Sequence, residues 1–113
     1  FDARDMHGCC NFGDRVPAVF FHPKSTRLHI RTGTDTSPND GCDPSTPLSM
    51  NGRFRTVTIR VIEDGTITVF FDGDRKVCER KMPGNTFPGG YWLSVYAGEW
   101  WTVAAHAEIK NLV

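Results

Sequence analysis

Two runs of alternating apolar and polar residues between residues 54 and 72 constrain the fold of this chain more than any other feature. The apolar positions are Val57, Ile59 and Val61 in the first run and Ile67, Val69 and Phe71 in the second. A period of two is typical of a β-strand with one buried face. The runs are separated by the turn 63–66, where Gly65 can adopt a positive φ, so the segment is predicted to be a β-hairpin with one face in the core.

Four further segments have the same short alternating pattern, at residues 18–21, 26–31, 91–96 and 105–112. The first two are joined by the turn 22–25 and are predicted to place Leu28 and Ile30 inward. The intervening loops 33–47 and 82–90 are rich in Gly, Pro, Asn and Asp, and no helical period persists for three turns. These features predict an all-β fold, an antiparallel β-sandwich or barrel.

The chain has 113 residues, the size of one domain, so we expect residues 1–113 to form a single unit. Its formal net charge is zero, and no long-range field would attract nucleic acid or an anionic membrane. No apolar run reaches the roughly 20 residues of a membrane helix. We therefore expect neither nucleic acid binding nor membrane insertion.

The even number of cysteines, four in a short chain, favours an oxidising, extracellular compartment and a secreted protein. The chain begins with Phe1 and not with an initiator Met, as a mature product does after removal of a leader, although a proteolytic fragment would look the same.

Adjacent Cys9 and Cys10 should have different partners. We expect one to pair with Cys42 and the other with Cys78, or one to bond to another chain. Zinc is disfavoured because there is no Cys-x-x-Cys and the four histidines do not cluster at ligand spacing.

From about residue 13 to residue 113, the order of features is similar to concanavalin A-like jelly-roll domains of the laminin-G or pentraxin type. The segments that carry the resemblance are PAVFF at 17–21, STRLHI at 25–30, the hairpin TVTIR to TVFFDG at 56–73 and AEIKNL at 107–112. The resemblance implies two antiparallel sheets packed face to face, with ligands held by rim loops or on the concave sheet. Family members usually run longer, and an opening strand is missing or very short here.

Aromatic residues gather between residues 91 and 101, where Tyr96, Trp100 and Trp101 lie close to Glu99. Sugars stack their C–H faces on such rings and bond their hydroxyls to nearby carboxylates, although rings in a small sandwich also fill the core. These four residues are a candidate glycan site.

A second candidate is the acidic loop 35–43, whose side-chain oxygens could bind Ca²⁺: Asp35, Asn39, Asp40 and Asp43. It is not an EF-hand, because the glycine falls one place late and Thr46 stands where the bidentate Glu belongs. Turn chemistry, in which Asn and Asp bond their own backbone, explains the composition equally well.

A third candidate is the outward row Arg27, His29 and Arg31, which could accept an acidic sugar or another carboxylate. Arg60 and His106 would join it if their strands share the sheet. A solvated strand face is the alternative interpretation. His22, which precedes Pro23, is interpreted as a turn residue and not as a ligand.

These patterns favour a secreted, non-catalytic lectin-like domain that binds a glycan or glycoprotein. A structural or adhesive subunit is the alternative, since an exposed sheet edge and the crowded cysteines could support a homo- or hetero-oligomer. A glycan hydrolase is a further alternative. It lacks support because the four glutamates are isolated and show none of the paired spacing that glycoside hydrolysis needs.

Overall fold

The structure is a computed structural model that describes residues 17–49 and 51–86. These residues form two antiparallel three-stranded sheets, which confirms the predicted all-β class and antiparallel pairing. No helix occurs among them, and so none that is long and apolar enough to cross a membrane. The predicted strands 91–96 and 105–112 lie outside the described residues.

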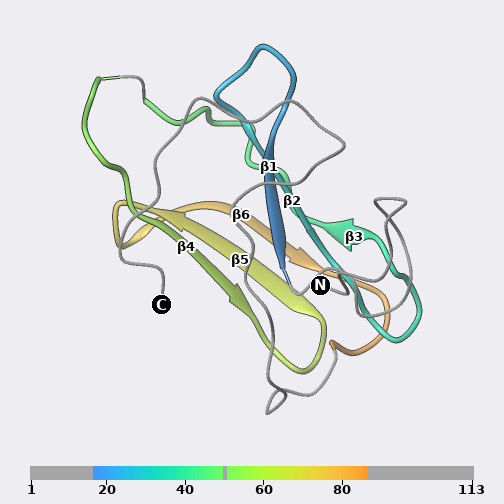
Figure 1. The fold of residues 1–113 in the computed structure, drawn as a ribbon. Helices are drawn as coiled ribbons and strands as arrows, with labels where there is room; N and C mark the ends of the chain where they lie inside the picture. Colours follow the sequence, from blue (N-terminus) through green and yellow to red (C-terminus); the bar gives the residue numbers. More distant parts are fainter. Residues whose placement is uncertain (1–16, 50, 87–113) are drawn as a thin grey trace, which may run out of the picture.

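The first sheet consists of β1 (Ala18–Phe21), β2 (Leu28–Thr32) and the two-residue β3 (Asp40–Gly41), in that order (Figure 1). The hairpin β1–β2 pairs Phe20 with His29 and Phe21 with Leu28. Its turn has Lys24 at a φ of 54° and is closed by a hydrogen bond from the His22 amide to the Arg27 carbonyl. This hairpin and its inward Leu28 and Ile30 are confirmed, whereas β3 was not predicted.

The second sheet consists of β4 (Val57–Val61), β5 (Thr66–Phe71) and β6 (Arg75–Lys81). The β4–β5 hairpin confirms the prediction from alternation, and its Ile67, Val69 and Phe71 are buried as expected. β6 was missed because four of its seven residues are basic and apolar alternation is absent. A register shift opposite Val69 and Phe70 further interrupts its period.

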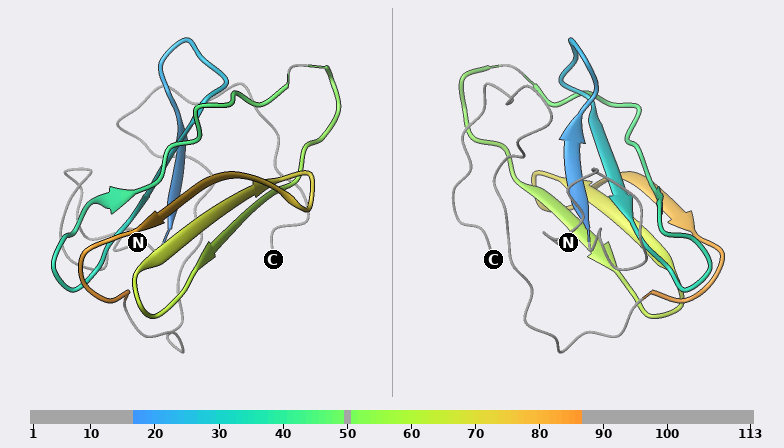
Figure 2. Two further views of the ribbon diagram at one scale, coloured as in Figure 1. Left: turned by 180° about the vertical axis from the view of Figure 1, so that it is seen from behind. Right: turned by 45° about the vertical axis from the view of Figure 1, so that its right-hand side comes forward.

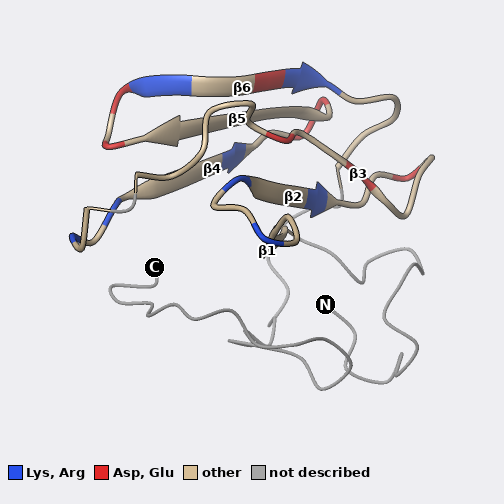
Figure 3. Cartoon of the chain, turned by 90° about the horizontal axis from the view of Figure 1, so that it is seen from above, with Lys and Arg blue, Asp and Glu red and all other residues tan. Residues whose placement is uncertain are grey.

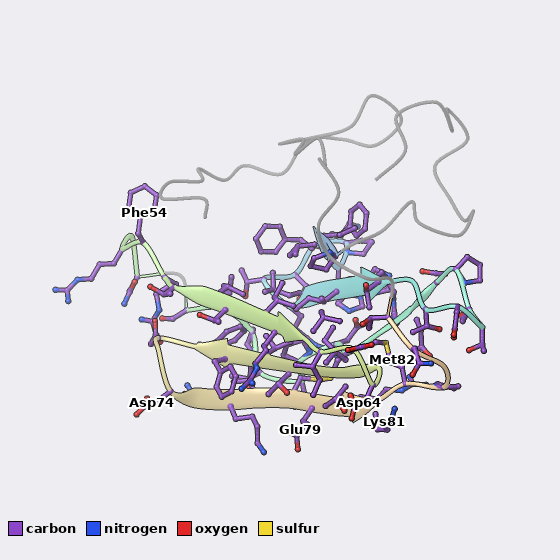
Figure 4. All side chains as sticks on the ribbon, turned by 90° about the horizontal axis from the view of Figure 1, so that it is seen from below. Phe54, Asp64, Asp74, Glu79, Lys81 and Met82 are labelled. Carbon is purple, nitrogen blue, oxygen red and sulfur yellow. A yellow bond between two sulfur atoms is a disulfide. The ribbon has the colours of Figure 1, made fainter. Side chains whose placement is uncertain are left out.

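The β1–β3 sheet crosses one face of the β4–β6 sheet (Figures 1 and 2). The buried core cluster draws from both sheets and the segments beside them: Leu28, Ile30, Cys42, Ile67, Val69, Phe71 and Met82. The labelled Glu79 and Lys81 on β6 point away from the first sheet (Figure 4). The inward face of each sheet is therefore apolar and the outward face of β6 is charged.

A disulfide and an ion pair connect β3 and the residue after it to β6. Cys42, next to β3, forms a disulfide with Cys78 of β6, with the two Cα atoms 6.1 Å apart. Beside it, the Arg80 guanidinium contacts the nearly buried Asp40 carboxylate, Nη1 to Oδ1 at 3.0 Å. The prediction that Cys42 and Cys78 each pair with Cys9 or Cys10 was wrong, because β3 and β6 bring Cys42 and Cys78 together.

Removing the disulfide should cost about 3–4 kcal/mol of unfolding free energy, because the bond closes a loop with a sequence separation of 36 residues. The test compares the C42A/C78A double variant with the unaltered chain in urea. Non-reducing peptide mapping is the control and should yield one peptide pair that joins Cys42 to Cys78. A peptide that links either residue to Cys9 or Cys10 would contradict the structure.

Gly65 should tolerate substitution by alanine less well than Gly73. Both have a positive φ, 90° at Gly65 and 99° at Gly73. A Cβ on Gly65 would collide with the backbone oxygens of Gly84 and Met82, whereas one on Gly73 would meet nothing within 4 Å. Gly73→Ala should cost about 1 kcal/mol from backbone strain alone, and Gly65→Ala about 3 kcal/mol because overlap adds to that strain. Equal losses in urea unfolding would show that the close approach at Gly65 is absent.

Candidate functional site

A cluster of polar and aromatic side chains lies on the outward face of the first sheet. The register places Phe20 directly opposite His29, and His22, two residues further along, is on the same face. On the other side of β2, Arg31 pairs with Gly41, so the chain beyond β3 brings Asp43 beside His29. Figure 3 shows basic segments in blue on β2 and acidic segments in red around β3. We call His22, His29, Arg31 and Asp43 the β2 polar cluster.

The Asp43 carboxylate is the centre of this cluster. Its Oδ1 accepts a hydrogen bond of 3.0 Å from the Ile30 amide. Its Oδ2 lies 2.8 Å from Nδ1 of His29 and accepts a hydrogen bond of 2.9 Å from Nη2 of Arg31. Nε2 of His22 is 3.3 Å from the same oxygen. One carboxylate therefore bonds His29 and Arg31 and lies close to His22.

The pKa of Asp43 lies below its ordinary value of 3.8. Partial burial alone would raise that pKa, but hydrogen bonds from His29 and the Ile30 amide and the charges of Arg31 and His29 outweigh it. At neutral pH the carboxylate is ionised and stays a hydrogen-bond acceptor.

Arg31 contacts the His29 ring as well as the carboxylate. Its Nε is 3.1 Å from Nε2 of His29, and its Nη2 is 3.2 Å from Nδ1. The ring of His29 also lies 5.2 Å from that of His22 and 6.2 Å from that of Phe20, centroid to centroid. The cluster stays within reach of solvent, since the side chains of both histidines are 33% exposed and those of Arg31 and Asp43 about a fifth.

His22 has an unsatisfied nitrogen. Its Nε2 is buried and makes no hydrogen bond, because the approach to Asp43 lacks hydrogen-bond geometry. Buried polar atoms without a partner are rare and costly. Among residues 17–49 and 51–86, His22, His29 and Asp43 are also the one group of His, Cys, Asp or Glu with ligand atoms close enough to hold a metal ion, within 4.8 Å of one another.

The predicted row Arg27, His29 and Arg31 is brought together only in part. His29 and Arg31 meet at Asp43, whereas Arg27 is exposed near the turn. Arg60 lies on β4 in the second sheet and so does not extend this face. His106 lies outside the described residues.

The acidic loop does not gather its four predicted oxygen ligands around one point. Asp35 accepts a hydrogen bond from the Asn85 amide, Asp40 pairs with Arg80, and Asp43 belongs to the β2 polar cluster. Asn39 is exposed. The turn interpretation fits Asp40, whose side chain accepts a hydrogen bond from the next amide, that of Gly41, whereas the bond from Asn85 to Asp35 joins two distant segments.

The candidate glycan residues Tyr96, Glu99, Trp100 and Trp101 lie outside the described residues. His22 was interpreted as a turn residue, and it does begin the β1–β2 turn, but it also joins the cluster. The signal that could have found it is the hairpin register. With Phe20 opposite His29, residue 22 is a diagonal neighbour of residue 29 on one face.

Comparison with known proteins identifies no relative: no family model, no curated protein and no solved structure matches the chain.

Asp43→Asn should remove an acid-sensitive part of the stability. Because the folded-state pKa of Asp43 is lowered, the ionised carboxylate stabilises the fold above about pH 4, and this contribution is lost as the pH falls through the lowered value. At pH 7 the variant should lose about 1–2 kcal/mol from weakened hydrogen bonds. Urea unfolding between pH 7 and pH 2.5 should then show a shallower acid loss than in the unaltered chain.

The matched control is Asp74→Asn, which changes an exposed carboxylate at the turn between β5 and β6. It should leave the acid dependence unchanged. If Asp43→Asn has the same pH dependence as Asp74→Asn, the carboxylate does not stabilise the cluster.

Proposed function

We propose that this chain is a secreted, non-catalytic domain of the lectin-like β-sandwich type that binds an acidic glycan or glycoprotein. The observation that carries the proposal is the β2 polar cluster. It combines a guanidinium, two imidazoles and a carboxylate on one partly exposed sheet face.

The chemistry of the cluster suits a sugar that bears a carboxylate. Arg31 contacts His29 and Asp43 through Nε and Nη2, so its Nη1 is the group that can donate to a ligand carboxylate, while Asp43 can accept from sugar hydroxyls. Phe20 lies beside His29 on the same face and adds apolar ring surface against which C–H groups of a sugar can pack. The register fixes these groups on neighbouring strands, so little entropy is lost when a ligand binds.

The two-sheet arrangement is consistent with a jelly-roll sandwich, and an inter-sheet disulfide suits an oxidising compartment. A second proposed contact for the same ligand is ring stacking by Tyr96, Trp100 and Trp101, with the Glu99 carboxylate accepting from a sugar hydroxyl. Self-association would raise the avidity of a weak single site.

A glycan array that includes sialylated and uronic-acid oligosaccharides tests this function. The unaltered chain should bind acidic glycans, and Arg31→Gln should lower affinity at least tenfold because a charge-assisted bond is lost. Arg60→Gln, on the other sheet, is the matched control and should bind normally. Trp100→Ala and Trp101→Ala measure the contribution of the aromatic segment.

A blank array would reject the lectin proposal and favour the structural or adhesive subunit. That alternative predicts a stable oligomer by light scattering. Turnover of any bound glycan would instead support the hydrolase alternative and contradict the non-catalytic assignment.

A further inference from the structure

We propose that His22, His29 and Asp43 form a three-ligand site for a divalent transition-metal ion, best suited to zinc. This inference reverses the sequence-based expectation that the histidines do not cluster at ligand spacing. The ligand atoms of the three residues all lie within 4.8 Å of one another.

The spacing of the ligand atoms suits one small ion. Zinc binds histidine nitrogen and carboxylate oxygen at about 2.0–2.2 Å, so two ligands at a tetrahedral angle are about 3.3 Å apart. Oδ2 of Asp43 is 3.3 Å from Nε2 of His22 and 2.8 Å from Nδ1 of His29. Nδ1 of His29 would release to solvent the proton that it shares with Oδ2, and small side-chain rotations would then bring all three atoms to bonding distance.

The unsatisfied Nε2 of His22 is an independent sign of a missing partner. It is buried and faces the carboxylate without making a hydrogen bond. A neutral imidazole nitrogen that faces a carboxylate and a second imidazole is an ordinary metal ligand. The bound ion would remove the cost of leaving this atom unpaired.

The surroundings hold the carboxylate in place for an ion. The Ile30 amide binds Oδ1, so Oδ2 is the oxygen left to face the two histidines. Such outer hydrogen bonds orient a ligand and are a usual part of metal sites. With nitrogen and oxygen ligands from two histidines and one carboxylate, the site suits zinc better than calcium, which prefers six to eight oxygens.

Arg31 opposes the metal ion. Its Nη2 donates to the same Oδ2 at 2.9 Å, so the guanidinium must leave this oxygen when an ion binds. Its positive charge would also repel the ion. The site is therefore expected to bind zinc with modest affinity, and the released Arg31 would lie beside the open fourth coordination position.

An acidic ligand could use that open position. A sugar carboxylate that binds the ion would also meet Arg31, which would couple metal binding to glycan binding. This last step rests on the proposed function, whereas the metal site does not.

Titration of the metal alone into the full chain tests the site. After treatment with EDTA and dialysis, calorimetry should give one Zn²⁺ per chain, and Co²⁺ should give the visible absorption of a tetrahedral complex. His22→Gln and His29→Gln should each weaken binding at least tenfold while circular dichroism shows an intact fold. Asp74→Asn and Glu79→Gln, whose exposed carboxylates lie outside the cluster, are the control variants and should bind as the unaltered chain does.

The Arg31→Gln variant distinguishes a metal site from a merely structural cluster. Removal of the competing cation should tighten zinc binding, by about tenfold. The proposal is overturned if the unaltered chain binds no zinc, or if His22→Gln and His29→Gln bind as well as the controls.

The glycan array, repeated with zinc and with EDTA, separates the two proposals. Zinc binding with a blank array would leave the metal site standing and reject the lectin. Glycan binding without zinc binding would do the reverse.

Discussion

The bonds between β3 and β6 are the constraint on which the rest of the structure depends. Neither three-stranded sheet can bury its apolar face alone, and the core cluster takes residues from both. The Cys42–Cys78 disulfide and the Asp40–Arg80 ion pair join the sheets beside that core. Because β3 is only two residues long, these bonds also fix the chain that follows it, and so they position Asp43.

Asp43 connects this framework to the candidate site. Its Oδ1 accepts a hydrogen bond from the amide of Ile30, a residue whose side chain lies in the core, and its Oδ2 contacts His29 and Arg31. His29 and Arg31 are thus held by strand pairing, and Asp43, just beyond β3, is held by its hydrogen bond to the Ile30 amide. Such a rigid support is what a binding site for a small, weakly held ligand needs.

The sequence predicted the parts of the fold that have a clear period. Alternation in β4 and β5 and in the β1–β2 hairpin gave their pairing and their buried faces. β6 was missed because its outward charges hide any alternation, and β3 because two residues cannot show a period. The disulfide was mispredicted since spacing along the chain does not reveal which strands meet.

For the candidate site, alternation alone predicted that His29 and Arg31 share an outward face. Their contacts with Asp43 and His22 depend on strand registers that the sequence alone did not provide.

The central claim is that the outward face of the first sheet, around Asp43, is where this protein binds its ligand. Side-chain nitrogen NMR of the four histidines in the full chain, before and after addition of a sialylated oligosaccharide, tests it most directly. The account predicts that the imidazole signals of His22 and His29 shift. Signals of His22 and His29 that stay in place at saturating oligosaccharide would contradict it.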